Sequence, residues 1–312
     1  MPHTKNTFLH LMYVPWTGLG LYGGFRGNRW LRNRITIFKN FVVPSLRNQN
    51  NKNFILWCSW RPQERGNKYV QELKKYMDGI KEFQTVFTYN GICFWDDKLD
   101  DETARKNLVI NLHYSTRDLL PFIKDNQDIL MTIQPSDDLY SSSVVGDIQG
   151  FFEQNPTTQA GGFIHGYICN YTTKEIAEYN PNTNPPFYTI RFPKDKFIEP
   201  LQHVRYTGPY TSHEYVPNFL RYTKWAERGF IVGCHGENIS TYFDHPFKGR
   251  NIVGEEREEI LRNFGVLESP LTDFKIGIRR RILKWLPHKI RRKLRYWVGE
   301  KIASRFYEFI RN

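Results

Sequence analysis

Short apolar runs alternate with segments of helical spacing in the first half of the chain, and this alternation restricts the possible folds more than any other feature. The apolar runs have the length of strands and lie at residues 8–14, 53–60, 83–89 and 129–133. The helical segments lie between them, at residues 34–48, 68–77 and 101–124. Strands in this order pair in parallel through right-handed helical crossovers, which cover both faces of the sheet. The sequence therefore predicts an α/β, Rossmann-like domain with a mostly parallel sheet flanked by helices.

The pattern changes in the second half of the chain. Three strand-like runs follow one another without a helix between them, at residues 161–171, 175–179 and 186–192. Turns that contain Asn and Pro separate them, which predicts a smaller mixed or antiparallel region at one edge of the sheet. Further on, residues 218–228 predict a helix that Gly229 ends, and residues 231–234 predict a strand.

Two adjacent carboxylates, Asp137 and Asp138, follow the fourth predicted strand. Pro135 has no backbone N–H and therefore ends the hydrogen bonding of that strand. Ligands of open α/β sheets bind at the carboxyl ends of the strands, and two neighbouring carboxylates repel each other unless a cation, a sugar hydroxyl or a proton lies between them. A divalent ion that carries a diphosphate is one solution. A helix over residues 139–154, capped by Ser136 and the two acids, is the other interpretation, and both can hold together.

Polar side chains in the segment before this strand are further candidates for the site. Arg105, Asn107 and Arg117 belong to the one or two helices predicted at residues 101–124. If Arg105 and Arg117 face the carboxyl edge of the sheet, they can bind an anionic substrate. The alternative is that each is a solvated charge on the outer face of a helix.

Almost all of the net charge lies at the end of the chain. Residues 275–312 contain 13 Lys and Arg against two acids, a balance of +11 out of a formal total of +12. Apolar residues recur there at helical spacing, which predicts a basic amphipathic tail at 273–312 that follows a domain at 1–272. Such a helix fits an anionic membrane surface. A nucleic-acid-binding arm needs the charge but not the apolar residues, so nucleic acid is the less favoured partner.

We recognise neither a signal peptide nor an apolar segment long enough to span a bilayer. The four cysteines, Cys58, Cys93, Cys169 and Cys234, are far apart in the sequence and lack the paired spacing of a metal site. Reduced thiols in a cytosolic protein are the simplest interpretation. We therefore expect a cytoplasmic protein that lies peripherally on the inner face of the membrane.

The order of these pieces over residues 8 to 245 resembles that of a GT-A glycosyltransferase, in the broad group that includes family 2 transferases and the rhamnosyl transferases of bacterial cell-surface glycan loci. The matching pieces are Val43-Pro44-Ser45-Leu46 with Gln49, the run at 53–60, Ser136-Asp137-Asp138, and His213-Glu214 ahead of Arg228-Gly229-Phe230. Families of this kind usually have Asp-x-Asp-Asp at the end of the fourth strand. Here Asp137 and Asp138 match the last two positions, and Pro135 stands where the first aspartate is expected.

The resemblance implies transfer of a sugar, with rhamnose as one candidate, from a nucleotide-sugar donor to a membrane-linked or cell-surface glycan. It implies a divalent cation, Mn²⁺ or Mg²⁺, held by Asp137, Asp138 and His235, with Asp137 and Arg117 near the donor diphosphate. It places the general base at Glu214. The structural alternatives are that Glu214 is a helix-capping acid and that His235 is a structural histidine that binds no metal or diphosphate. The alternative function is a non-catalytic nucleotide- or glycan-binding module whose basic tail binds nucleic acid.

Overall fold

The computed structural model describes residues 8–16, 28–90, 101–124, 127–207, 213–235, 238 and 241–266. The basic tail predicted at 273–312 lies outside the described residues, as does Cys93. The other three cysteines are free and buried, as expected for reduced thiols in a core.

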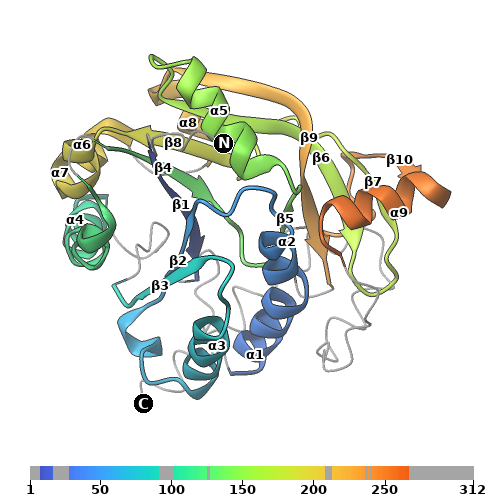
Figure 1. The fold of residues 1–312 in the computed structure, drawn as a ribbon, viewed down its shortest axis with the longest axis horizontal. Coiled ribbons are helices and arrows are strands. Elements are labelled where there is room, and N and C mark those ends of the chain that lie inside the picture. Colours follow the sequence, from blue (N-terminus) through green and yellow to red (C-terminus); the bar gives the residue numbers. More distant parts are fainter. Residues whose placement is uncertain are drawn as a thin grey trace.

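Within the described residues, ten strands form one sheet, and its first half is parallel (Figure 1). The strands β3 (Gln84–Thr88), β2 (Ile55–Ser59), β1 (Phe8–Pro15) and β4 (Asp128–Ile133) lie side by side in that order. All three pairings between them are parallel. These are the four strands that the sequence pattern predicts, so the parallel core is confirmed.

The second half of the sheet is mainly antiparallel and continues from β4. Its strands are β8 (Tyr188–Phe192), β6 (Ala160–Asn170), β7 (Ile176–Tyr179) and β10 (Lys248–Ile252), with β9 (Tyr222–Cys234) beside β6 and the short β5 (Leu139–Tyr140) beside β9. The β6–β9 pair is parallel, and the other pairings are antiparallel. The fold is therefore α/β as predicted, with a parallel half flanked by helices and a mixed region that continues from one edge of it.

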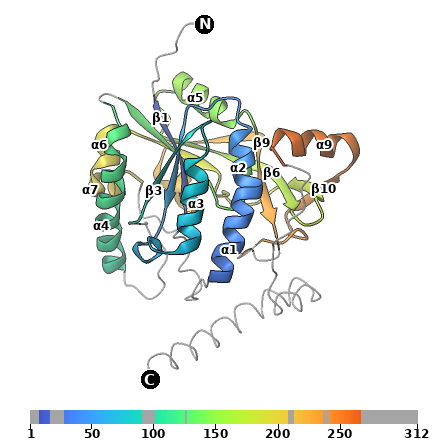
Figure 2. The ribbon, with the colours of Figure 1, turned by 60° about the horizontal axis from the view of Figure 1, so that its bottom comes forward.

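Helices cover both faces of the parallel half (Figure 2). One face packs against α1 (Asn28–Ile37), α2 (Val43–Arg47) and α3 (Lys68–Asp78), and the other against α4 (Asp101–Leu119), α6 (Lys194–Ile198) and α7 (Pro200–Thr207). Strand β1 supplies both cores, because Met12 and Val14 face the first and Leu11 and Tyr13 the second. The other α-helices of the described residues are α5 (Val144–Gln154), α8 (Val216–Phe219) and α9 (Gly254–Asn263).

The helix predicted at residues 34–48 begins earlier and contains a wide turn. A π-helical turn at Phe38–Val42 joins α1 to α2, and the N–H of Val43 donates to the carbonyl of Phe38. Pro44 is the second residue of α2, two residues after the end of this turn. Because Pro44 has no N–H and its ring crowds the carbonyl four residues earlier, the chain passes it by widening the turn rather than by ending the helix.

The helix predicted at residues 218–228 is wrong. Those residues contribute only the last two residues of the four-residue α8 and the first part of β9, a strand of 13 residues. The aromatic and β-branched side chains Tyr222, Thr223 and Trp225 favour a strand, and pairing with β6 supplies the hydrogen bonds. Gly229 has no capping role, because it lies inside the strand.

Glycines of β6 and β9 face aromatic rings across the strand pair. At four glycines a Cβ atom would overlap an aromatic ring of the neighbouring segment, and the pairs are Gly161 with Trp225, Gly166 with Phe230, Gly229 with Phe163, and Gly233 with Tyr171. Two of these glycines are on β6 and two on β9. Each strand therefore provides the space that a ring of the other side fills.

Candidate active site

The two acids of the sequence motif lie in a turn between β4 and β5. This turn, Gln134–Asp138, follows the carboxyl end of β4, and β5 follows it directly. Helix α5 does not begin until Val144, and its N-cap residue is Ser143. The helix predicted at 139–154 was therefore placed too early, and the interpretation of Asp137 and Asp138 as its cap is wrong.

Side chains from α2 and its end fix the segment that leaves the turn. The hydroxyl of Ser45 donates to the carbonyl oxygen of Tyr140 at 2.8 Å. The side-chain amide of Gln49 donates to the carbonyl of Ser141 at 2.7 Å and accepts from the N–H of Val145 at 3.2 Å. Both side chains are buried, so these hydrogen bonds are shielded from water. Ser45 and Gln49, which the resemblance singled out, thus position the acid turn.

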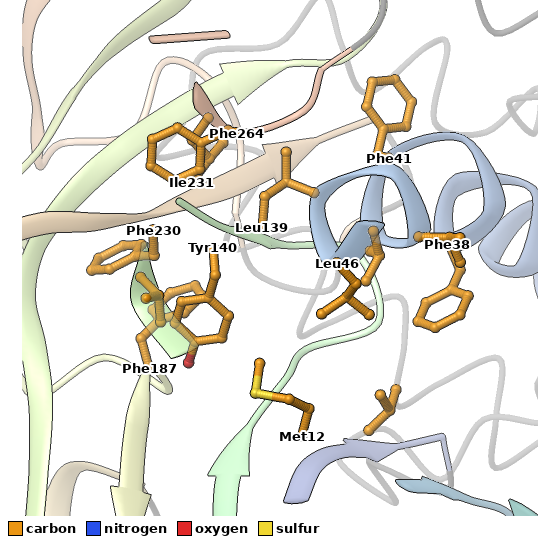
Figure 3. Packing of buried hydrophobic residues seen from close by; sticks show 14 of the residues in the cluster. Met12, Phe38, Phe41, Leu46, Leu139, Tyr140, Phe187, Phe230, Ile231 and Phe264 are labelled. Carbon is orange, nitrogen blue, oxygen red and sulfur yellow. The ribbon is translucent and has the colours of Figure 1, made fainter. Parts of the chain in front are cut away.

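Apolar contacts hold β5 between the helix and β9 (Figure 3). Leu139 and Tyr140 lie close to Leu46 on one side and to Ile231 and Phe230 on the other. The ring of Phe230 stacks on Phe187 at a centroid distance of 3.8 Å. The turn that carries the two acids is therefore anchored at its exit by a packed core, which keeps its side chains in place.

The end of β9 is in close contact with the turn that carries the two acids. The N–H of Gly233 donates to Oδ1 of Asp138 at 2.9 Å, and the hydroxyl of Tyr171 donates to the backbone carbonyl of Asp137 at 2.8 Å. A Cβ at Gly233 would overlap both that carbonyl oxygen and the ring of Tyr171. Glycine is thus required here for the approach of the two segments.

Three side chains converge on one carboxylate oxygen of Asp137. The guanidinium of Arg34, from α1, forms an ion pair with Oδ2. Nε2 of His235 lies 3.1 Å from the same oxygen, and the amide of Asn238 donates to it at 3.3 Å. The side chain of Arg34 is 5% exposed and that of Asp137 is 15% exposed, so the ion pair is largely removed from water. The backbone N–H of His235 also donates to Oδ1 of Asn238 at 2.8 Å, which ties these two residues together.

The surroundings shift the pKa values of the two acids in opposite directions. Burial alone would raise the pKa of Asp137, but the charge of Arg34 and the hydrogen bond from His235 lower this pKa to about 2. Burial raises the pKa of Asp138 well above its ordinary value of 3.8, and the charge of Asp137 raises it further. One acid is thus ionised beside another that resists ionisation.

Comparing Asp138→Asn with the wild type should show how Asp138 makes the free energy of unfolding depend on pH. Because the pKa of Asp138 is raised in the folded state, its contribution is fully present below pH 3.8 and is lost as the pH rises toward the folded-state pKa. The free energy of unfolding of Asp138→Asn, relative to the wild type, should therefore increase above about pH 4, by up to about 1.4 kcal/mol per pH unit. Urea denaturation between about pH 5 and pH 8 measures this difference. Asp147→Asn, at an exposed position on α5, is the matched control, and a pH-independent difference for Asp138→Asn would contradict the assignment.

As arranged, the three predicted metal ligands do not fit a divalent cation. Among the described residues, no group of three or more His, Cys, Asp or Glu side chains is arranged to hold a metal ion. Oδ2 of Asp137 already interacts with Arg34, His235 and Asn238, and Oδ1 of Asp138 accepts a backbone hydrogen bond. A divalent cation prefers oxygen ligands whose negative charge is not already balanced by a cation of the protein.

The other predicted site residues lie on elements other than those that carry the described contacts of Asp137 and Asp138. Glu214 is exposed in a 3-10 turn at His213–Tyr215, ahead of α8, and the neighbouring His213 contacts the backbone carbonyl of Asn184. Arg117 is exposed in the last turn of α4. Arg105 belongs to the part of α4 whose side chains lie outside the described set. The roles of these three residues remain predictions.

Sequence reasoning missed two residues of the cluster. Arg34 lies in a helical segment more than 100 residues before Asp137, and no spacing links them. Asn238 follows His235 by three residues, and an asparagine after a strand end is a common partner for local backbone groups. This was the one signal that the sequence offered for either residue.

None of the helices in the described part of the chain combines the length and the apolar character that crossing a bilayer requires.

Comparison with known proteins gives weak likenesses only. No family model matches the chain, and no curated protein matches it. Among solved structures, S. aureus TarS 1-349 is 12% identical with a TM-score of 0.37 and covers 72% of this chain, and this chain covers 60% of TarS 1-349. Mouse xyloside xylosyltransferase 1 is 9% identical with a TM-score of 0.29, over 69% of this chain and 77% of that one. The present chain thus spans less than two thirds of TarS 1-349.

Proposed function

We propose that this chain is a glycosyltransferase that moves a sugar from a nucleotide-sugar donor to a glycan acceptor. The observation that supports this most is the convergence of separate motifs at one place. His235 contacts Asp137, and the side chains of Ser45 and Gln49 hold the backbone of Tyr140 and Ser141 directly after the acid pair. Three segments that are far apart in the sequence therefore meet at the carboxyl end of β4. Open α/β sheets bind ligands at that edge.

The reaction requires a group that stabilises the charge of the leaving diphosphate and a base that takes the proton of the acceptor hydroxyl. An acceptor hydroxyl oxygen forms a bond to the anomeric carbon of the sugar, while the bond from that carbon to the diphosphate oxygen breaks and its electron pair leaves with the diphosphate. The hydroxyl proton passes to a carboxylate, for which Glu214 is the proposed base. An inverting displacement with the base on the far face of the sugar is the geometry that we assign, by analogy with inverting glycosidases. Arg105 and Arg117 remain the proposed donor contacts outside the cluster.

Finer features of the proposal come from the sequence. Rhamnose as the transferred sugar and a cell-surface acceptor follow from the resemblance of the motifs. A lipid-linked acceptor and contact with an anionic membrane surface follow from the basic, apolar tail at 273–312.

A thermal-shift screen of nucleotide sugars tests the proposal. A donor that binds the folded chain should raise the free energy of unfolding by about 2.7 kcal/mol at a concentration 100 times its Kd. The matching nucleoside monophosphate and the free sugar serve as controls, because each lacks the bond between the anomeric carbon and the diphosphate that is broken. Mass spectrometry of acceptor glycans incubated with the binding donor then detects transfer. If no nucleotide sugar raises the melting temperature and a polynucleotide does, the non-catalytic alternative is supported instead.

A further inference from the structure

The most unusual group at the acid pair is a buried cation that belongs to the protein. Arg34 extends from α1 and forms the ion pair with Asp137, and its guanidinium also lies 5.2 Å from the centre of the Trp30 ring. A guanidinium remains protonated at any pH at which the protein is folded, so its charge is permanent. Because its side chain is 5% exposed, water screens that charge poorly.

The hydrogen bonds at Asp137 also assign the proton of His235. A carboxylate oxygen can only accept, so the contact of 3.1 Å between Oδ2 and Nε2 of His235 requires a proton on Nε2. A ring nitrogen that carries a proton has no lone pair for a metal. Asn238 stabilises the same arrangement, since its amide donates both to Oδ2 of Asp137 and to the carbonyl of Gly233. His235 is thus a hydrogen-bond donor to the acid in this arrangement.

The second acid offers little to a metal ion either. Oδ1 of Asp138 accepts from the N–H of Gly233, and its side chain is buried. A divalent cation would have to displace the guanidinium of Arg34 from Asp137 and move the proton of His235 away from Nε2. Each change removes an interaction that the fold already makes.

We propose that Arg34 supplies the positive charge at this acid pair, so that the site takes no divalent cation. The statement about metal binding stands on the geometry alone. Its consequence for catalysis, which is sugar transfer that proceeds without Mn²⁺ or Mg²⁺, rests on the proposed function.

Titration of the full chain with Mn²⁺, followed by the electron paramagnetic resonance signal of the free ion, tests the proposal directly. The wild type alone should bind no Mn²⁺ at this site in the micromolar range. In the presence of a nucleoside diphosphate, it should bind no more Mn²⁺ than the nucleotide itself binds. Arg34→Met keeps the length of the side chain and removes its charge, and should bind Mn²⁺ at least tenfold more tightly than the wild type. Arg191→Met is the matched control, because Arg191 pairs with Asp128 at the opposite end of β4 and should leave Mn²⁺ binding unchanged.

Three further measurements do not depend on the folding of Arg34→Met. The melting temperature of the wild type should be equal with Mn²⁺ and with a chelator. Stoichiometric binding of Mn²⁺ by the wild type that Asp137→Asn abolishes would overturn the proposal. If a donor is identified, transfer should persist in the chelator; transfer that is lost there and restored by Mn²⁺ would overturn the inference and leave the glycosyltransferase function intact. If no donor binds, the proposed function fails, while the Mn²⁺ titration still decides the role of Arg34.

Discussion

Replacing Asp137 with alanine should lower the free energy of unfolding by about 3 to 5 kcal/mol, because the change leaves the guanidinium of Arg34 buried without its anion. Part of this loss has a defined pH dependence. The pKa of Asp137 is lowered from 3.8 to about 2, so its contribution, about 2 kcal/mol by linkage, is present above pH 3.8 and disappears as the pH falls through about 2. Urea denaturation of both proteins at neutral and acidic pH measures the effect.

The matched control for this prediction is Asp128→Ala, which breaks the Arg191–Asp128 pair at the other end of β4. Its side chains are 19% and 29% exposed, so the expected loss is about 1 kcal/mol or less. The double variant Asp137→Ala with Arg34→Met should recover much of the loss, since it removes the unpaired charge. A cost for Asp137→Ala no larger than that for Asp128→Ala would show that the Arg34 pair is not effectively buried.

Replacing Glu214 with glutamine should reduce the rate of sugar transfer by about 10²- to 10⁴-fold, the usual contribution of a general base. Glutamine keeps the size of the side chain but cannot take the proton of the acceptor hydroxyl. Donor affinity, measured by thermal shift, should remain as in the wild type, because the base acts in the transition state. Initial rates at saturating donor give the turnover number.

Glu227→Gln provides the comparison for Glu214, since Glu227 is another exposed acid of the same half of the chain, on β9. It should leave both the rate and the donor affinity unchanged. Weaker donor binding by Glu214→Gln with an unchanged turnover number would assign Glu214 to donor recognition instead of proton transfer.

The parallel half of the fold could be predicted from the sequence because its signals are local. Strands β1, β2 and β4 are buried and therefore read as short apolar runs, and Asn67 accepts from the N–H of Tyr69 at the start of α3. Strand β9 could not be predicted in this way. Its first half contains Lys224, Glu227 and Arg228 beside Trp225, and its conformation depends on pairing with β6, about 60 residues earlier in the sequence.

The candidate site could be predicted only in part, for a similar reason. Asp137, Asp138 and His235 follow strand-like runs, and the carboxyl ends of strands are where ligand-binding residues gather. Arg34 has no such signal, because its role depends on how α1 docks against the turn after β4. The sequence thus indicated the acids and the histidine but not the cation that neutralises one of them.

The glycine and ring pairs at β6 and β9 affect where the residues of the candidate site lie along the sheet. If β9 slipped by two residues against β6, side chains would replace glycines beneath the four rings, and the volume they need is not there. The four pairs together therefore fix the register of β9 against β6, which one pair alone would fix less firmly. That register sets how far the end of β9 reaches, and with it the height at which His235 meets Asp137. Small residues in the middle of a strand, far from any reacting group, would thus control whether the polar cluster closes at all.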